Sequence, residues 1–182
     1  MSKVDLAKYN NDWYQPGSAV KRFIWFICGH TFINSYLPLP SSIRCRILRV
    51  FGAKIGENVV IKPKVNIKYP WFLSIGKNAW IGEEVWIDNL TQVNIGANAC
   101  ISQGAMLLTG NHNYKSPAFD LMIGEINLEE GVWIGAKAVV CPGVRCLEHA
   151  MLGAGGVLSK DMGKYEVWSG NPATFLKNRQ IS

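Results

Sequence analysis

The sequence predicts an all-β solenoid, and three observations carry this prediction. Aliphatic residues recur every six positions over most of the chain, small residues recur four positions after them, and glycine directly follows the aliphatic residue in several repeats. The chain has 182 residues, of which 48% are hydrophobic and 18% charged. This composition suffices for one domain with a core and excludes a disordered chain.

The six-residue period puts one large and one small side chain inside each repeat. Neither a helical period of about 3.6 residues nor simple strand alternation does this, whereas short straight segments joined by corners do. Three segments make one coil of a prism, so we expect about five coils of stacked parallel strands. The large positions are Ile55, Ile61, Ile67, Ile75, Ile81, Ile87, Ile95, Ile101, Leu107, Leu128, Ile134, Val140, Cys146, Leu152 and Leu158. The small positions run from Val59 and Val65 through Trp71, Ala79, Val85, Thr91, Ala99, Ala105 and Asn111 to Val132, Ala138, Val144, Ala150, Gly156 and Met162.

Residues 1–54 precede the repeat and predict an N-terminal helical cap segment. The stretch from Phe23 to Ile43 has no charged residue, but glycine and proline interrupt it, which argues against a membrane-spanning helix. Two interpretations stay open: the segment covers the end of the solenoid, or it lies on an anionic membrane surface, because basic residues flank it. The first residues do not resemble a secretory signal. We expect a cytoplasmic protein, at the inner face of the membrane in the second case.

The repeat covers residues 55–163 and is interrupted once. Leu107 and Leu128 are separated by one hexad plus a further loop, which we place at 113–127. A long loop in a compact solenoid usually has a function. Residues 164–182 form a short C-terminal extension.

The charge and the cysteine content limit the classes of partner and the kinds of metal or disulfide site that we expect. The formal net charge of +6 favours an anionic partner. The basic residues are scattered through the repeat without interleaved aromatics, which argues against nucleic acid. Five cysteines without a C-x-x-C pair indicate neither a disulfide framework nor a structural zinc site, and we expect no metal.

The runs IGENVV, IGKNAWIGEEVW, WIGAKAV and LGAGGV resemble the hexapeptide-repeat acyltransferases. The stretches FGAKIGENVVIKPKVNIKYPW and ISQGAMLLTGNHNY and the late SGNPA are most similar to sugar O-acetyltransferases of the colanic-acid-biosynthesis type, over about residues 46–172. The resemblance implies a left-handed parallel β-helix, acetyl-coenzyme A (acetyl-CoA) as acyl donor, and a homotrimer with active sites between subunits. It also implies a sugar or lipid-linked oligosaccharide acceptor from surface polysaccharide synthesis.

The resemblance implies that His112 is the general base. A neutral imidazole can take the proton of a sugar hydroxyl near pH 7. The pattern supports this role, because the small-residue track breaks at Asn111 and the chain then leaves the repeat. Many relatives carry an aspartate directly after the histidine, whereas this chain has Asn113. The group that orients the imidazole is therefore Asp120, Glu125 or a backbone carbonyl.

Other polar residues have weaker signals. Asn89 corresponds to an asparagine that binds the acceptor hydroxyl in some sugar acetyltransferases, and Asp88 is a comparable candidate. His30 and His149 are interpreted as structural or surface residues. A metal site of the carbonic-anhydrase type would need three converging histidines.

The resemblance also implies a cofactor site in the second half of the chain. The backbone amides of Gly135 and Ala136 are expected to be donors, since small residues let a ligand approach the backbone. Charged groups near the C-terminus suit the phosphates of coenzyme A (CoA). The cofactor candidates are Trp133, Gly135, Ala136, Gly153, Ala154, Lys160, Asn171, Pro172 and Lys177.

Counting the repeat register predicts which residues share an outer face. One face carries Trp80, Cys100, Trp133 and Met151, and another carries Phe72, Gln92, His112 and Arg145. The base and the cofactor tryptophan then lie on different faces of one subunit, so that a trimer would have to bring them together.

The preferred function is an acetyl-CoA-dependent sugar O-acetyltransferase. Two alternatives stay open at this point. One is an N-acetyltransferase acting on an amino sugar nucleotide, and the other is a metal-dependent or non-catalytic β-helix protein.

Overall fold

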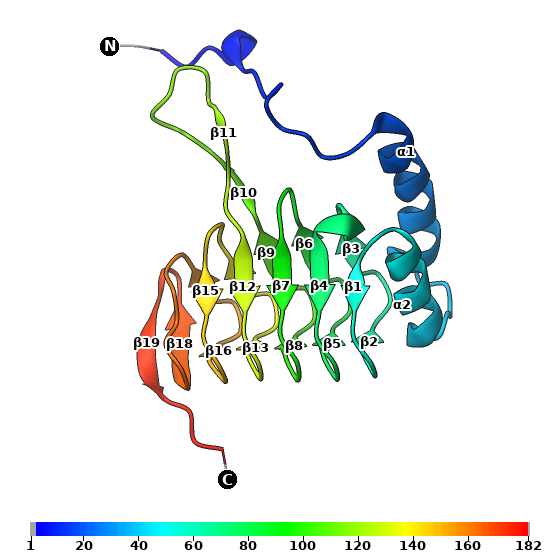
Figure 1. Cartoon of the computed structure of the whole chain (residues 1–182). Coiled ribbons are helices and arrows are strands. Elements are labelled where there is room, and N and C mark those ends of the chain that lie inside the picture. The colour runs from blue at the N-terminus through cyan, green and yellow to red at the C-terminus, as the bar shows by residue number, and fades with distance from the viewer. Residues whose placement is uncertain (1–2, 182) are drawn as a thin grey trace.

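The fold is a three-sided solenoid of parallel strands with helices at its N-terminal end (Figure 1). It is seen in a computed structural model that describes residues 3–181. Sheet A contains β1 (Lys54–Ile55), β4 (Leu73–Ile75), β7 (Val93–Ile95), β12 (Ile126–Leu128) and β15 (Arg145–Cys146). Sheet B contains β2 (Val60–Ile61), β5 (Trp80–Ile81), β8 (Cys100–Ile101), β13 (Trp133–Ile134), β16 (Met151–Leu152), β18 (Glu166–Gly170) and the antiparallel β19 (Ala173–Asn178). Sheet C contains β3 (Asn66–Ile67), β6 (Trp86–Asp88), β9 (Met106–Leu108), β14 (Val139–Val140) and β17 (Val157–Leu158).

The chain visits sheets A, B and C in turn, so the strands make five coils and β18 continues sheet B beyond them. This confirms the solenoid of about five coils. The large positions of the repeat fill its axis: all are buried except Ile55, which is half-buried in the first coil. Stacking like positions buries a continuous apolar column that no single coil could bury alone.

The small positions are also buried, apart from Trp71, Thr91 and Asn111. Trp71 was expected to point inward, and this is wrong. It lies in the 3₁₀ turn η3 (Pro70–Phe72), where its Nε1 donates to the Pro16 carbonyl at 3.1 Å. The two residues inserted after Ile67 lift this turn out of the prism wall.

Two devices form the corners. Glycine follows the inward aliphatic residue because the next coil is too close for a side chain: a Cβ on Gly82 would lie 2.6 Å from the Gln103 nitrogen. Two residues later the backbone is left-handed, as at Asn58, Asn78 and Asn98. Asparagine tolerates this conformation better than most residues.

The N-terminal segment covers the first coil. It contains η1 (Leu6–Lys8), α1 (Ala19–Cys28), the π-helical turn η2 (Gly29–Ile33) and α2 (Ser41–Val50). Trp25 of α1 is buried and its Nε1 donates to the Ile67 carbonyl at 3.0 Å, while Leu48 of α2 is fully buried. Through these contacts the inner side of the segment packs on the first coil, in agreement with the end-capping interpretation. None of the helices within residues 3–181 combines the length and apolarity needed to cross a bilayer.

A hairpin leaves the solenoid at the corner between sheets C and A. Its strands are β10 (Gly110–His112) and β11 (Leu121–Ile123), which pair only with each other. The loop expected at 113–127 therefore starts inside this hairpin, and its last residues belong to β12. Residues 3–18 pass above the solenoid to reach the hairpin, where the Asp5 amide donates to the Pro117 carbonyl at 2.8 Å (Figure 1).

Candidate active site

His112 lies at the end of β10, with its ring held on two sides. The imidazole stacks on Phe119 with ring centroids 4.4 Å apart and contacts the Tyr9 ring at 5.7 Å. Its Nδ1 lies 2.9 Å from the Phe119 carbonyl oxygen. Of the orienting groups left open by the sequence, the backbone carbonyl is therefore the one that contacts the ring.

This contact determines which ring nitrogen is free. A carbonyl oxygen can only accept, so the hydrogen bond requires the proton on Nδ1. In a neutral imidazole the lone pair is then on Nε2. The geometry therefore holds His112 in the tautomer that can accept a proton at Nε2.

The N-terminal arm, which we define as residues 3–18 before α1, forms one wall of a cleft beside His112. The cleft has a volume of about 550 Å³ and is lined by arm residues such as Tyr9 and Tyr14 on one side and by Lys68, Tyr69 and His112 on the other. The Tyr14 hydroxyl donates to the Leu90 carbonyl at 2.7 Å, and burial raises the pKa of this phenol far above its usual range. Tyr14 therefore stays protonated and anchors the arm.

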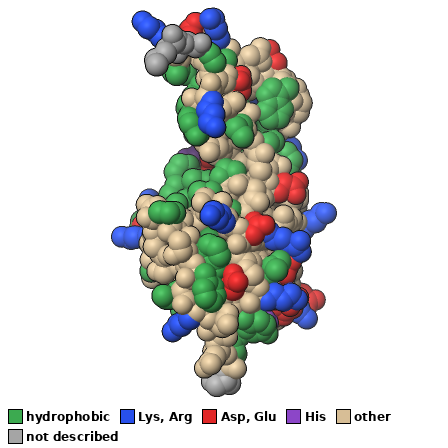
Figure 2. Space-filling model, turned by 90° about the vertical axis from the view of Figure 1, so that its left-hand side faces the viewer, with side chains coloured by type: hydrophobic (Ala, Val, Ile, Leu, Met, Phe, Trp, Pro, Cys, Tyr) green, Lys and Arg blue, Asp and Glu red, His purple; other side chains and the backbone are tan. Residues whose placement is uncertain are grey.

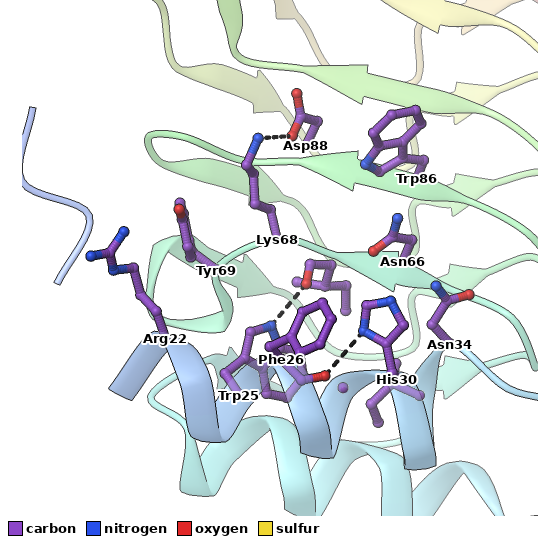
Figure 3. A pocket seen from close by; sticks show the side chains of 13 residues that line it. Arg22, Trp25, Phe26, His30, Asn34, Asn66, Lys68, Tyr69, Trp86 and Asp88 are labelled. Atoms are coloured by element: carbon purple, nitrogen blue, oxygen red, sulfur yellow. Dashed lines mark hydrogen bonds and ion pairs between the residues drawn. The ribbon is translucent and has the colours of Figure 1, made fainter. Parts of the chain in front are cut away.

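A second cleft, of about 380 Å³, lies between α1 and sheet C (Figure 3). It adjoins the first, because Arg22, Lys68 and Tyr69 line both. Lys68 Nζ forms an ion pair with Asp88 Oδ1 at 2.8 Å, and Trp86 lies further along the same wall. Of these residues the sequence singled out Asp88 as a candidate for contact with the acceptor, and the cleft itself forms through the packing of α1.

Asn89 has a structural role. Its side chain is fully buried, accepts from the Tyr69 amide at 3.0 Å, and donates to the Tyr69 and Phe72 carbonyls at 2.6 and 3.2 Å. The expected contact of Asn89 with an acceptor hydroxyl is therefore wrong: the amide holds the inserted turn and is not exposed to the cleft.

Most of the cofactor candidates lie on sheet B and on the corner that leads from it to sheet C. Trp133 is 39% exposed, and its Cα partners across the sheet are Cys100 and Met151. Together with Trp80 they form the face that register counting predicts. The Trp133 Nε1 donates to Ser102 Oγ at 2.9 Å, which fixes the indole against the sheet.

The corner amides differ from the expectation. Gly135 donates to the Leu152 carbonyl at 2.8 Å and Gly153 to the Trp168 carbonyl at 2.7 Å, so the expected free donor at Gly135 is wrong. The amides of Ala136 and Ala154, by contrast, have no backbone partner among the residues in the described range.

The remaining cofactor candidates separate into two groups. Asn171 and Pro172 lie in the turn between β18 and β19, and Lys177 lies on β19, so all three belong to sheet B. Lys160 follows β17 of sheet C and lies at the corner between sheets C and A. The structure therefore separates Lys160 from the other candidates.

The second face predicted by register counting is wrong. The residues in register with Arg145 on sheet A are Asn127, Asn94 and Ser74. Phe72, Gln92 and His112 do not share this row, because the inserted residues after Ile67 and Ile87 and the hairpin after Leu107 shift the register.

His112 and Trp133 nevertheless lie on opposite sides of the solenoid. In a three-sided prism the corner between two faces is opposite the third face. His112 projects from the corner between sheets C and A, whereas Trp133 lies on sheet B, so the apolar core separates them.

The other histidines have local partners. His30 Nδ1 lies 3.0 Å from the Phe26 carbonyl, and the His149 ring packs against Tyr165. Within residues 3–181, no group of three or more His, Cys, Asp or Glu side chains is arranged to hold a metal ion.

Known proteins resemble this chain in sequence and fold. No protein-family model matches it. It is 36% identical over 166 residues to a protein of Escherichia coli strain K12 named colanic acid biosynthesis acetyltransferase WcaF, with 91% of each chain covered. It is 28% identical over 143 residues to the galactoside O-acetyltransferase of the same strain, over 76% of this chain and 70% of that one.

Solved structures share the fold. A hexapeptide-repeat-containing acetyltransferase from Vibrio cholerae complexed with acetyl coenzyme A superposes with a TM-score of 0.82 at 20% identity, covering 92% of this chain and 93% of that one. A galactoside acetyltransferase in complex with coenzyme A superposes with a TM-score of 0.79 at 24% identity, covering 88% and 82%. The solenoid is thus a left-handed parallel β-helix, as the resemblance implied. With the identity to WcaF extending over nine-tenths of both chains, this chain belongs to the hexapeptide-repeat acyltransferases and is an acetyltransferase related to the colanic acid biosynthesis type.

Proposed function

We propose that this enzyme transfers acetyl from acetyl-CoA to a hydroxyl of a sugar used in surface polysaccharide synthesis, with His112 as general base. The observation that carries the proposal is the His112 imidazole, whose Nδ1 bonds to the Phe119 carbonyl and whose Nε2 is left to accept a proton beside a cleft. The similarity to WcaF and to a galactoside O-acetyltransferase supports a sugar acceptor.

In the proposed reaction Nε2 of His112 takes the proton of the acceptor hydroxyl as its oxygen attacks the thioester carbonyl carbon. The new C–O bond forms, and the carbonyl electrons move to the oxygen of a tetrahedral intermediate. The C–S bond then breaks, and the imidazolium returns its proton to the sulfur of CoA. The Phe119 carbonyl stabilises the imidazolium through the Nδ1 proton.

The acyl donor would lie along the corner from sheet B to sheet C. The unpartnered amides of Ala136 and Ala154 suit carbonyl groups of a pantetheine arm or the oxyanion of the intermediate. The exposed face of Trp133 suits apolar atoms of the arm, and Lys177 on the same sheet suits phosphate. Complexes of structural neighbours with acetyl-CoA and CoA support this choice of donor.

The proposed active site needs more than one copy of the chain. His112 and the Trp133 corner are on opposite sides of the solenoid, so one copy would supply the base and the next the donor site. A cyclic trimer satisfies this, because each copy then presents both surfaces to different neighbours.

The test replaces His112. His112→Asn removes the base, since a carboxamide does not accept a proton near neutral pH, and should lower turnover about 10²- to 10⁴-fold. Binding of acetyl-CoA, measured by calorimetry, should be unchanged. The matched control is His149→Asn, because asparagine tolerates the left-handed backbone at His149, where φ is +58°. Near-normal turnover of His112→Asn would contradict the role of His112.

Sugars carrying either a hydroxyl or an amine at the acceptor position distinguish O- from N-acetylation.

A further inference from the structure

Helix α1 is apolar on two opposite sides. Its inner side packs on the solenoid through buried Trp25. Its outer side carries Val20, Phe23, Ile24 and Ile27, which are 69%, 65%, 47% and 50% exposed. Their spacing puts them in one stripe along the helix, and helices that are apolar all round are usually buried. We therefore expect another surface to cover the outer stripe.

The apolar surface continues from α1 toward α2. A groove of about 370 Å³ lies between the two helices, with Phe32 and Val50 among its lining residues and Arg46 beside them. Val50 is largely exposed, as is the Arg46 side chain. We call the α1 stripe and this groove the cap surface. It combines exposed apolar side chains with a neighbouring cation.

The charge of the chain is concentrated in the same segment. Residues 13–56 contain six Lys and Arg residues and no Asp or Glu, so the remaining 13 basic and 13 acidic residues balance and the whole net charge of +6 resides there. Arg44 and Arg49 bond to backbone carbonyls and Lys21 Nζ lies over the Trp71 ring, 4.2 Å from its centroid, while Arg46 and Lys54 are exposed. At the opposite end of the solenoid, basic and acidic side chains are interspersed (Figure 2).

We propose that the cap surface docks the enzyme on a bilayer containing anionic phospholipid. The apolar stripe of α1 enters the interfacial region, and the exposed cations lie among the anionic headgroups, which attract them. A second copy meeting this surface cap to cap would bring two sets of uncompensated cations together. Anionic lipid neutralises them, so the charge favours lipid as the occupant.

Docking in this way has a consequence for the acceptor that rests on the proposed function. The cleft between α1 and sheet C lies on the inner side of the helix whose outer side meets the membrane (Figure 3). A sugar attached to a membrane lipid would therefore reach the cleft that leads to His112. In a cyclic oligomer all copies present the cap surface in equivalent orientations about the axis, and their contributions to binding combine.

The experiment is flotation of the full-length protein with vesicles of phosphatidylcholine alone or with added phosphatidylglycerol. We expect binding to the anionic vesicles and little to the neutral ones, with loss in high salt. The double variant Phe23→Ser, Ile27→Ser should lower the partition to anionic vesicles by about tenfold or more. The control is Phe175→Ser, Leu176→Ser on β19, which removes similarly exposed apolar side chains far from α1. This control should float like the unmodified protein.

Three outcomes overturn the proposal: equal binding to both vesicle types, full binding by the α1 double variant, or a change in oligomeric mass in that variant, which would show that a second copy covers the stripe. Circular dichroism checks that the variants fold. Turnover with a water-soluble sugar acceptor is measured without vesicles, and it reports on the proposed acetyl transfer independently of docking.

Discussion

At the scale of single residues, the ring of the proposed base His112 is oriented by a backbone carbonyl and not by the residue that follows it. Asn113 has no carboxylate with which to orient the imidazole, and the Phe119 carbonyl contacts Nδ1 instead. A carbonyl carries less charge than a carboxylate but imposes the same tautomer, because it too can only accept. Asn89 was predicted to bind the acceptor, but its side-chain amide is fully occupied by hydrogen bonds to the backbone.

The role of Asn89 can be tested by stability. Asn89→Ala leaves the part-buried Tyr69 amide and Phe72 carbonyl without their side-chain partner, whereas the Tyr69 carbonyl keeps the Phe72 amide, and it should lower the free energy of unfolding by about 2–4 kcal/mol. Urea denaturation measures this change. Asn66→Ala is the control, because within the described part of the chain the Asn66 side chain has no hydrogen bond, and it should change stability by about 0.5 kcal/mol or less. Equal effects would contradict the structural role.

At the scale of the elements, the coils stack because two corner positions have different requirements. At the corners where glycine follows the inward aliphatic residue, the next coil leaves no room for a side chain, and the residue two positions later adopts a positive φ. The first requirement is steric and depends on a neighbour; the second is conformational and local.

These requirements predict different costs for the same substitution. In Gly82→Ala the Cβ would lie 2.6 Å from a backbone nitrogen of the next coil, so we expect a loss of about 3 kcal/mol or more. Gly143 has a φ of +82° and no atom near its Cβ position, so Gly143→Ala should cost only about 1–2 kcal/mol. Chemical denaturation compares the two. A smaller cost at Gly82 would refute the close-approach explanation.

At the scale of the whole molecule, the proposed base and the proposed donor site lie on opposite sides of a rigid prism. No local rearrangement brings them together, because the buried aliphatic column lies between them. The proposed trimer follows from this separation.

Mixed assemblies test the trimer. Chains with His112→Asn and chains with Trp133→Ala should each be impaired, whereas a co-refolded mixture should regain activity, because about a third of the sites in each mixed trimer combine an intact His112 with an intact Trp133. Turnover of the mixture is compared with that of each variant, and analytical ultracentrifugation gives the mass of the assembly. A mixture no more active than its components would argue against shared sites.

The solenoid could be predicted because its information is local. A period of six with one large and one small inward residue admits only short strands and corners, and the predicted column from Ile61 to Leu158 is buried. The resemblance pointed to His112 as a candidate base, and the departure of the chain from the period beside it supported that prediction. The predicted outer face was wrong at Phe72 and Gln92 because two residues are inserted after Ile67 and two after Ile87. These insertions shift the register of the outward-pointing residues, whereas the inward-pointing residues stay aligned from coil to coil.

The six-residue period was therefore sufficient to predict the coils, the buried core and the position at which the hairpin leaves the solenoid. Tertiary structure decided which other groups meet. The N-terminal arm beside His112 and α1 against sheet C are contacts between segments far apart in the chain, and the Phe119 carbonyl on Nδ1 is a contact within the hairpin. None of these contacts involves the repeat, so the six-residue period encodes none of them. The same packing buries one side of α1 and leaves its other side exposed in the cationic cap.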